Sequence, residues 1–385
     1  MTLRAERLNI GIELIDDPNW MGGILYLRNL AVTLTRLTGS ERPQVHLLGA
    51  AQAIERLLGE SDNRRLFEKR RSGLAGRLMR RLRLKRDEES RIDVIYPGFG
   101  AKAEGATIVS WIPDFQHRHL PHLFSAEELA ARDRSIEAIA TKPGIVVVSS
   151  DVAAEDFSRF FPGHRATVKV WHFRSLIDTT QPASRATIDK HGLPSKYLYL
   201  PNQFWTHKNH ITALKALARL RDEHGMTIPL VCTGAQSDRR NESHFASLTK
   251  FIADAGLANQ VYLLGLIDRK EQVDIFRHAA AIVQPSLFEG WSTVVEDARA
   301  IGRPIFLSDI PVHREQNPGA GTTYFTPLSD GELARQLAEA WPSLTAGPDP
   351  EAESRAQSEM NQLIVSAGWT FVGIMHKAIE LRRVS

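Results

Sequence analysis

The clearest chemical pattern in the sequence lies at residues 285–298, where a strand-like apolar run ends and a helical pattern begins. Glu289 falls in the loop between them, where its carboxylate can accept hydrogen bonds from sugar hydroxyls. Gly290, Trp291 and Ser292 follow, and at a helix start their backbone N–H groups can hold further oxygens of the same ligand. The pattern therefore predicts a ligand site in this loop.

Glu296 lies one helical turn further along and has two interpretations. Its carboxylate can bind the two hydroxyls of a ribose in the same crevice. Alternatively, Thr293 and Glu296 have the spacing of a capping box, in which the glutamate side chain binds only the Thr293 backbone N–H. The sequence leaves both interpretations open.

A second polar cluster follows the apolar run that ends at Leu200. Lys208 stands between that run and the next helical pattern, where its compact charge can meet a diphosphate and stabilise it as a leaving group. Asn202 and Gln203 can donate amide hydrogens to the same oxygens. We expect these three side chains to bind one ligand together.

Two adjacent glycines, Gly22 and Gly23, precede the helical stretch Ile24–Leu37. A helix N-terminus directly after a strand offers backbone N–H groups and the positive end of the helix dipole, which suit a phosphate. The spacing is not that of a G-x-G-x-x-G motif, and the acid expected after the second strand is missing, so a dinucleotide site is weakly supported. The glycines belong either to a phosphate site or to a tight turn that needs them.

Strand-like runs alternate with helical patterns along nearly the whole chain, which is typical of parallel sheets wrapped by helices. Each half repeats the alternation, so we expect two doubly wound, Rossmann-like domains at 1–178 and 196–360, with the linker near 178–195. A last amphipathic helix at 369–383 is expected to pack back on the first domain. Ligands of such sheets bind beyond the carboxyl ends of the strands, where the loops above fall. The expected strands are Leu8–Ile15, Val45–Gly49, Val94–Pro97, Thr107–Trp111, Ile145–Ser149, Val168–Trp171, Tyr197–Leu200, Leu230–Thr233, Val261–Leu264, Ala281–Gln284, Pro304–Leu307 and Thr323–Phe325.

Length and composition agree with this organisation. At 385 residues the chain exceeds the usual size of a single core, and 43% apolar and 24% charged residues are ordinary for a globular protein. The one cysteine, Cys232, lies in an apolar run, which predicts a buried thiol and a reducing compartment. Residues 1–7 lack an apolar signal core and no run of 18 apolar residues occurs, so we expect a cytoplasmic protein without a membrane span.

Residues 64–86 carry eleven Lys and Arg residues against one acid, Glu68. Leu74, Leu78 and Leu82 would form an apolar stripe on a basic helix, a pattern that suits the surface of an anionic membrane. The alternative is a solvated basic loop. Nucleic acid is not an expected partner, because no recognition module or interleaved aromatic residues accompany the charge.

The Glu-Gly-Trp sequence at 289–291 and the Glu-Asp-Ala sequence at 296–298, preceded by the polar segment 202–208, resemble glycosyltransferase family 4. Members of that family are retaining enzymes of the GT-B fold, so the resemblance implies an α/β protein with two Rossmann-like domains facing a central cleft. The sequence departs from the family in two ways. Six residues rather than seven separate the two glutamates, and the arginine that usually precedes the lysine is missing, leaving Lys208 as the main cation.

The resemblance also implies roles for individual residues. Glu289 and the amides after it would hold the donor hexose, Glu296 the ribose, and Lys208 the diphosphate. The donor-binding set is then Gly22, Gly23, Asn202, Gln203, Lys208, Glu289, Gly290, Trp291, Ser292, Thr293 and Glu296.

Many family members carry a histidine, followed by an acid, in a loop that approaches the donor sugar. In the corresponding loop 112–122 of this chain, Pro113 stands in the place of the histidine and Asp114 in that of the acid. Asp114 and His117 are therefore candidates to face the reacting sugar, and with Lys208 and Glu289 they complete the catalytic set. A metal site in this loop is not expected, because its prolines imply an irregular loop without a helical i, i+4 pair of ligands.

No two aspartates lie two positions apart, so the Asp-x-Asp metal-binding motif of the other main glycosyltransferase fold is absent. The resemblance therefore implies a metal-independent enzyme without a cofactor. We expect it to move a hexose, a mannose-type donor being favoured, from a nucleotide diphosphate sugar to a saccharide or lipid-linked saccharide. The variant resembles a subgroup often associated with the assembly of bacterial surface polysaccharide, so we expect a role in polysaccharide or lipopolysaccharide biosynthesis. Two alternatives remain, a sugar-nucleotide epimerase of the same shape and a non-catalytic subunit that binds the sugar nucleotide.

Overall fold

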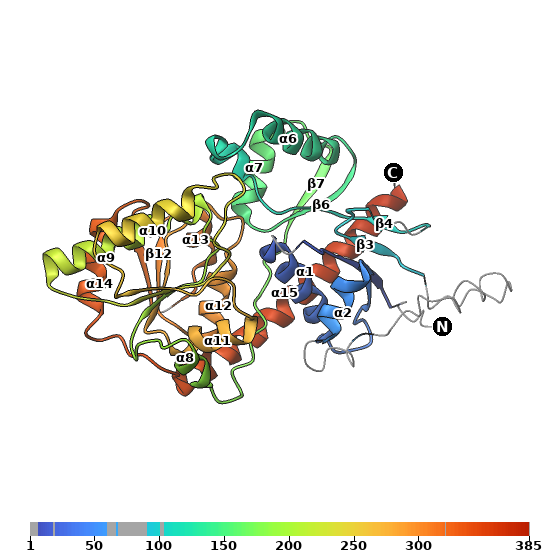
Figure 1. Ribbon diagram of the computed structural model, residues 1–385. Helices are drawn as coiled ribbons and strands as arrows, with labels where there is room; N and C mark the ends of the chain where they lie inside the picture. The colour runs from blue at the N-terminus through green and yellow to red at the C-terminus, as the bar shows by residue number, and fades with distance from the viewer. Residues whose placement is uncertain are drawn as a thin grey trace. The chain divides into compact units, whose positions relative to one another are not determined.

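A computed structural model describes residues 7–17, 20–59, 67, 91–100, 104–319 and 321–384 of the chain (Figure 1). The chain forms two compact units. Unit 1 consists of Met1–Pro113, Asp133–Arg174 and Gln362–Ser385, and unit 2 consists of Asp114–Arg132 and Ser175–Asn361. Apart from Phe67, the basic stretch 64–86 lies outside the described residues.

The division differs from the sequence-based bounds chiefly in one segment. Residues 114–132, which hold Asp114 and His117, belong to unit 2 although the chain before and after them belongs to unit 1. Residues 362–384 belong to unit 1, the unit on which a helix at 369–383 was expected to pack. Segment 114–132 is joined to unit 2 by contacts between residues distant in sequence, which a pattern of strands and helices does not contain.

Unit 2 contains a six-stranded parallel sheet with the order β10-β9-β8-β11-β12-β13. In chain order this is 3-2-1-4-5-6, the arrangement of a doubly wound fold, whose direction reverses between β8 and β11. The central strands β8 and β9 are apolar and fully buried, as expected where both faces of a sheet are covered. Their bounds are β8 Leu198–Leu200, β9 Leu230–Cys232, β10 Val261–Leu263, β11 Ala281–Gln284, β12 Ile305–Ser308 and β13 Thr322–Phe325.

Alternating side chains of β8 explain how the two faces are covered. Leu198 and Leu200 join the core formed with α9, α10 and α14. Tyr197 and Tyr199 point to the other face, where Tyr199 packs edge-on against Phe276 of α11. Figure 1 shows these two groups of helices on opposite sides of the sheet. The helices of this unit are α5 Gln116–His119, η2 Pro121–Leu123, α8 Ala186–Lys190, η3 Thr206–Lys208, α9 His210–His224, α10 His244–Asp254, α11 Arg269–His278, α12 Thr293–Ile301, α13 Pro311–Gln316 and α14 Asp330–Ala340.

Unit 1 contains two parallel sheets, β2-β1-β3-β4 and β5-β6-β7. The single strand expected at Thr107–Trp111 is wrong, because the chain changes partner at Val109. β4 pairs with β3, and the Val109 N–H still donates to the Ile95 carbonyl, whereas β5 pairs with β6. Among the described residues of this unit, the strands are β1 Asn9–Leu14, β2 Gln44–Gly49, β3 Val94–Tyr96, β4 Thr107–Ile108, β5 Ser110–Ile112, β6 Gly144–Val148 and β7 Ala166–Val170, and the helices are α1 Met21–Thr35, α2 Ala51–Gly59 and α7 Asp151–Phe160.

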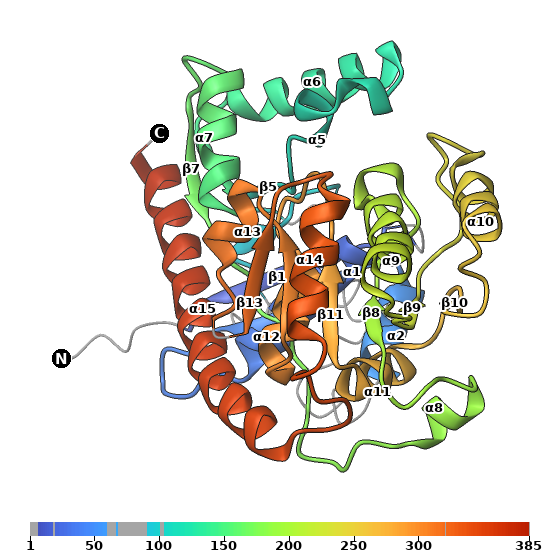
Figure 2. The same cartoon turned by 90° about the vertical axis from the view of Figure 1, so that its left-hand side faces the viewer.

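Two helices contribute residues to both units, α6 (Ala126–Ala140) and α15 (Pro350–Val384). α15 begins at Pro350, well before the helix expected at 369–383. Proline is tolerated in the first helical turn, because the N–H that it lacks would have no hydrogen-bond partner there. In unit 1, the Trp171 Nε1–H donates to the Ala367 carbonyl at 2.8 Å, and the Phe371 ring packs edge-on against Trp171. Figure 2 shows α15 along its full length.

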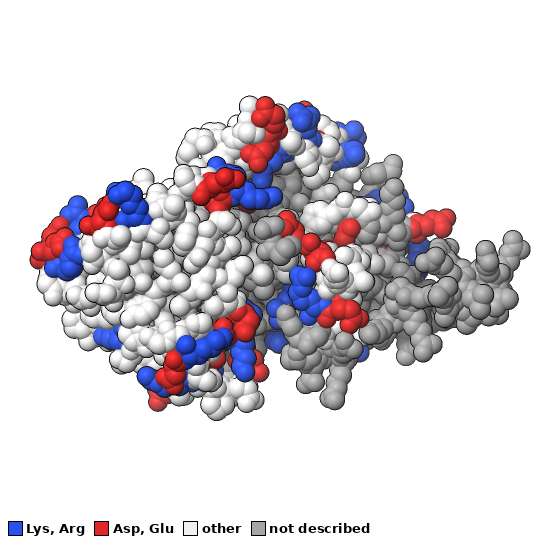
Figure 3. Space-filling view, viewed as in Figure 1, with Lys and Arg blue, Asp and Glu red and all other residues white. Residues whose placement is uncertain are grey.

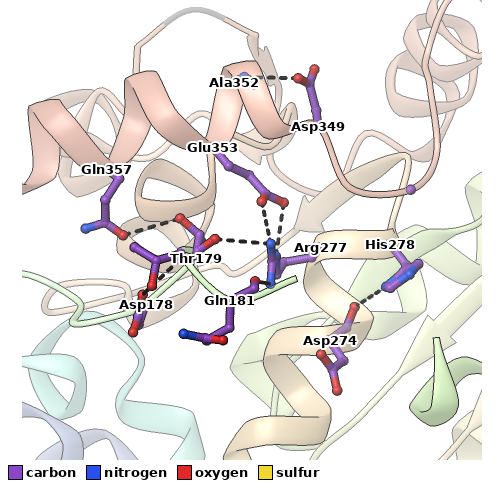
Figure 4. Close-up of polar contacts among 12 residues, drawn as sticks. Asp178, Thr179, Gln181, Asp274, Arg277, His278, Asp349, Ala352, Glu353 and Gln357 are labelled. Carbon is purple, nitrogen blue, oxygen red and sulfur yellow. Dashed lines mark hydrogen bonds and ion pairs between the residues drawn. The ribbon is translucent and has the colours of Figure 1, made fainter. Parts of the chain in front are cut away.

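The first turns of α15 are fixed in unit 2 by a buried ion pair (Figure 4). Arg277 Nη2 lies 2.6 Å from Glu353 Oε2, and the two side chains are 6% and 4% exposed. The same guanidinium donates to the carbonyls of Thr179 and Gln181. Arg277 thus joins α11, α15 and the chain segment that enters unit 2.

The described surface of unit 2 carries charges of both signs in small groups, as Figure 3 shows for one face. Arg219 with Glu223 and Lys250 with Asp254 are exposed pairs one helical turn apart. Such pairs contribute little to stability. No helix among the described residues is long and apolar enough to cross a membrane.

Candidate functional site

The loops after β8 and β11 meet where the strand order of unit 2 reverses. The Leu287 N–H donates to the His207 carbonyl at 2.8 Å, and Asn209 Nδ2 donates to the Pro285 carbonyl at 3.0 Å. Asn209 adopts a left-handed conformation, with φ of 56°, which asparagine tolerates better than most residues. The two loops are therefore one hydrogen-bonded body at the position where doubly wound folds bind ligands.

Lys208 and Glu289, the two central residues of the predicted site, are in direct contact. Lys208 Nζ lies 2.6 Å from Glu289 Oε1, and their side chains are 15% and 9% exposed. The sequence separation is 81 residues, so the topology of the sheet alone brings them together. An ammonium group and a carboxylate side by side can bind a ligand that carries both an anionic group and hydroxyls.

Gln284, at the end of β11, is a residue that the sequence analysis missed. It is fully buried, and its Nε2 donates to Glu289 Oε1 at 2.8 Å. The same nitrogen also lies within 3.1 Å of the Ser286 and Ser292 hydroxyls. Its Oε1 accepts from Asn202 Nδ2 at 2.5 Å. A polar side chain closing an otherwise apolar buried strand was the available signal.

The Asn202 amide was expected to donate to ligand oxygens, but it is 5% exposed and donates to Gln284. It therefore orients Gln284, which in turn holds Glu289. Gln203 is half-buried at the surface of the same loop. A close approach fixes this loop from the side of β9, because a Cβ on Gly234, whose φ is 139°, would lie 2.2 Å from the Asn202 carbonyl oxygen.

Glu296 lies in α12, where the structure excludes the register of the capping box. Ser292 is the N-cap residue and Thr293 is the first helical residue, so Glu296 is one position past the one that closes such a box. The Glu296 side chain is fully buried. Gln316 Nε2 donates to its Oε1 at 3.3 Å, and Arg299 Nε lies 3.8 Å away.

The backbone N–H groups at the start of α12 differ from the expectation at one residue. The Ser292 N–H was expected to face a ligand, but it donates to Gln316 Oε1 at 3.0 Å. The Gly290 N–H forms no hydrogen bond within the described part of the chain. Gly290 and Thr293 are half-buried, and Trp291 is 8% exposed.

The loop after β9 adds a second ion pair, Asp238 and Arg240, which the sequence analysis also missed. Asp238 Oδ2 accepts from the backbone N–H and the hydroxyl of Thr206, at 3.0 and 3.2 Å. Burial alone would raise the pKa of Asp238, but hydrogen bonds from the backbone N–H groups of Thr206 and Arg240, together with the guanidinium, lower it. The carboxylate thus ties the loops of β8 and β9 together.

His207 stands between the two cations of these loops. Burial lowers the pKa of its imidazole well below the ordinary value, and the charges of Lys208 and Arg240 lower it further. The ring is therefore neutral at pH 7. Arg240 Nη2 lies 3.4 Å from His207 Nδ1, and since a guanidinium can only donate, Nδ1 is the acceptor.

Asp114 and His117 differ in their surroundings. Asp114 Oδ1 accepts from the Gln116 N–H at 3.0 Å, and its side chain is half-buried. His117 is 1% exposed, with the rings of Phe115 and Phe124 each 6.4 Å away. Of the two candidates, Asp114 has the more accessible side chain.

Gly22 and Gly23 lie in the first turn of α1, in unit 1. Neither glycine has a positive φ, so neither is needed for a left-handed backbone conformation. A Cβ on Gly23 would meet the Trp20 ring at 2.8 Å, whereas nothing lies within 4 Å of one on Gly22. Gly23 is therefore required by the packing of Trp20, whose ring stacks on Trp111 at 5.5 Å.

The core thiol predicted for Cys232 is confirmed. The residue lies in β9 and is 2% exposed, and burial raises the pKa of its thiol.

Comparisons with known proteins agree with the architecture. Residues 185–342 match the family described as glycosyl transferases group 1. The chain is 25% identical over 192 residues to a D-inositol 3-phosphate glycosyltransferase of Streptomyces avermitilis. That match covers 48% of this chain and 41% of the relative, so it spans less than half of either protein.

Many solved structures resemble the chain, and two of them match nearly its whole length. HepE of Anabaena, crystallised with UDP and glucose, has a TM-score of 0.62 at 16% identity and is matched over 96% of this chain and 100% of its own. Sucrose-phosphate synthase of Thermosynechococcus elongatus has a TM-score of 0.61 at 15% identity, with 98% of each chain matched. At this identity the likeness concerns the fold, which is GT-B. The sequence match in unit 2 and the fold of the whole chain together support a glycosyltransferase of the GT-B fold.

Proposed function

We propose that this chain transfers a hexosyl group from a nucleotide diphosphate sugar to an acceptor hydroxyl, with retention at the anomeric carbon. The observation that supports this most directly is the Lys208–Glu289 pair in the loops where the strand order of unit 2 reverses. HepE, of the same fold, was crystallised with UDP and glucose. Retention, and membership of glycosyltransferase family 4, rest on the resemblance of the loops around Glu289 and Glu296.

In the proposed reaction the bond between the anomeric carbon and the diphosphate breaks, and a bond from the acceptor oxygen forms on the same face of the sugar. The acceptor proton passes to an oxygen of the departing phosphate. Lys208 stabilises the charge that develops on that phosphate. Glu289 binds hexose hydroxyls and Glu296 the ribose, while Asn202 acts through Gln284 by holding Glu289.

We further propose that a mannose-type donor is preferred and that the acceptor is a saccharide or a lipid-linked saccharide bound mainly by unit 1. The reaction would need no metal ion, because Lys208 and backbone N–H groups meet the charge of the diphosphate. The setting would be the cytoplasmic face of a membrane, with residues 64–86 on its anionic surface, in the assembly of surface polysaccharide. The composition of residues 64–86 and the family resemblance support these points.

The test is release of nucleoside diphosphate from a panel of nucleotide sugars, with and without saccharide acceptors. Acceptor-dependent release that yields a new glycoside supports transfer. Conversion of the donor without acceptor supports the epimerase, and binding without conversion supports a non-catalytic subunit.

Lys208→Ala should lower kcat about 100-fold or more, the scale for one lost electrostatic donor. Lys190→Ala is the matched control, because Lys190 also pairs with a glutamate of unit 2, Glu271, outside the site. Turnover of Lys208→Ala within threefold of the parent would remove Lys208 from the mechanism.

A further inference from the structure

Segment 114–132 is held on unit 2 by contacts with two of the loops that build the donor site. Gln116 Oε1 accepts from Arg240 Nη1, in the loop after β9, at 2.7 Å. The His119 ring lies 5.1 Å from that of Phe288, the residue before Glu289. The segment thus touches the loop of β9 and the loop of β11, although it lies between two strands of unit 1 in the sequence.

Arg240 also contacts other residues of the donor-site loops and of the segment. Besides Gln116, its guanidinium lies 3.4 Å from Asp238 Oδ1 and 3.4 Å from His207 Nδ1. The guanidinium carbon is 5.0 Å from the centre of the Phe124 ring and 5.4 Å from that of Trp205. A planar guanidinium can donate in several fixed directions and pack against aromatic rings at once, which a lysine cannot do.

The surroundings of Arg240 fix its position before any ligand arrives. Asp238 is 2% exposed and the Arg240 side chain 17% exposed. Asp238 Oδ1 also accepts the backbone N–H of Arg240 at 3.0 Å, so the carboxylate holds both ends of the residue. The guanidinium therefore stands at a set distance from the loop of β8, with Nη1 directed to Gln116.

We propose that Arg240 is a positioning residue that fixes segment 114–132, and with it Asp114, against the donor-binding loops of unit 2. Asp114 is two residues from Gln116, and its Oδ1 is bonded to the Gln116 N–H, so a fixed Gln116 fixes the carboxylate. Asp114 then keeps its place relative to Lys208 and Glu289 whatever arrangement the two units adopt. The part of this proposal that concerns turnover rests on the proposed glycosyl transfer, whereas the part that concerns the segment does not.

Arg240→Ala is the test. Arg239→Ala is its matched control, because Arg239 is exposed and its replacement removes the same charge at the neighbouring position. Gln116→Leu breaks the same hydrogen bond from the other side and leaves the guanidinium with Asp238. The three variants are compared with the parent by hydrogen–deuterium exchange of the full chain. UDP and GDP affinities are measured by calorimetry, and kcat and KM with the best donor.

In Arg240→Ala and Gln116→Leu we expect the amides of residues 116–120 to exchange at least tenfold faster, with Arg239→Ala unchanged. Dissociation constants for UDP and GDP should stay within twofold of the parent. The kcat should fall at least tenfold while the donor KM changes less than threefold, and Arg240→Lys should recover only part of the kcat.

Two results would overturn the proposal. Unchanged exchange at 116–120 in both Arg240→Ala and Gln116→Leu would mean that the contact does not hold the segment. Unchanged exchange in Gln116→Leu, with nucleoside diphosphate binding weakened at least tenfold in Arg240→Ala, would make Arg240 a ligand of the diphosphate instead. Because exchange is read without substrate, it decides the role of Arg240 even if no donor is turned over.

Discussion

Replacing Glu289 by glutamine should make the protein bind free nucleoside diphosphate more tightly while it loses turnover. In the ligand-free protein, Lys208 Nζ is 2.6 Å from Glu289 Oε1. A diphosphate must share this ammonium with the carboxylate, and the two anions repel each other. Glu289→Gln keeps the size of the side chain and an acceptor oxygen but removes the competing charge.

The magnitude follows from the contact. A hydrogen bond to a charged group contributes about 1.5–3 kcal/mol. The lower end applies here, because both side chains retain some exposure to water, at 15% and 9%. Release of about 1.4 kcal/mol to the diphosphate corresponds to a tenfold lower dissociation constant. The complete nucleotide sugar gains less, since its hexose loses the carboxylate that accepts its hydroxyls.

Calorimetry with UDP and GDP measures the affinity, and nucleoside diphosphate release from the sugar nucleotide measures turnover. Glu271→Gln is the control, because it removes the carboxylate of the Lys190–Glu271 pair outside the site. An affinity that stays the same or weakens in Glu289→Gln would refute the reasoning. It would mean either that Lys208 does not meet the diphosphate or that the pair does not exist in solution.

Three further predictions concern stability, pH and metal. Glu353→Gln leaves the guanidinium of Arg277, which is 6% exposed, without its carboxylate. We therefore expect urea titrations to show a free energy of unfolding lower by about 3 kcal/mol or more. Glu351 is exposed, so Glu351→Gln is the control and should change the free energy of unfolding little. Burial lowers the pKa of His210 to about 3. Between pH 6.5 and pH 3 only the unfolded chain binds a proton at this residue, so the free energy of unfolding falls as the pH falls. His210→Phe, whose ring can still stack on Phe204, should reduce this pH dependence by up to about 1.4 kcal/mol per pH unit. Turnover should survive excess EDTA, and silencing by the chelator with rescue by Mn²⁺ would contradict the proposed role of Lys208.

The sheet of unit 2 could be predicted from sequence almost residue by residue. The apolar runs that form β8 and β11 are short, lie between polar loops and are buried on both faces, so their limits coincide with changes in residue type. The strand order was not needed to locate Lys208 and Glu289, because both follow the carboxyl ends of strands. The fold class implied that their loops lie at one edge of the sheet, whereas the direct ion pair between the two side chains was not predicted.

The remaining features depend on information that local patterns lack. The capping-box register at Thr293 is off by one residue, because Ser292 rather than Thr293 leaves the helical conformation. Gln284 offered only the signal of a polar side chain at the end of an apolar strand and Arg240 offered none, because the partners of both residues are many tens of residues away in sequence. The assignment of segment 114–132 to unit 2 depends on such contacts as well, so no periodicity could reveal it.

The placement of the last helix has a consequence for how the protein is made on the ribosome. Chains emerge from the N-terminus, and N-terminal domains usually fold first. Here the aromatic cluster of unit 1 includes Phe371, which is fully buried against Tyr96 and Trp171. Both partners leave the ribosome before Phe371 does, and residues 175–361 of unit 2 are synthesised in between, so the two rings lack this contact during that time. The unit that begins the chain is therefore the later of the two to be completed, and chaperone contact during synthesis should concentrate on it.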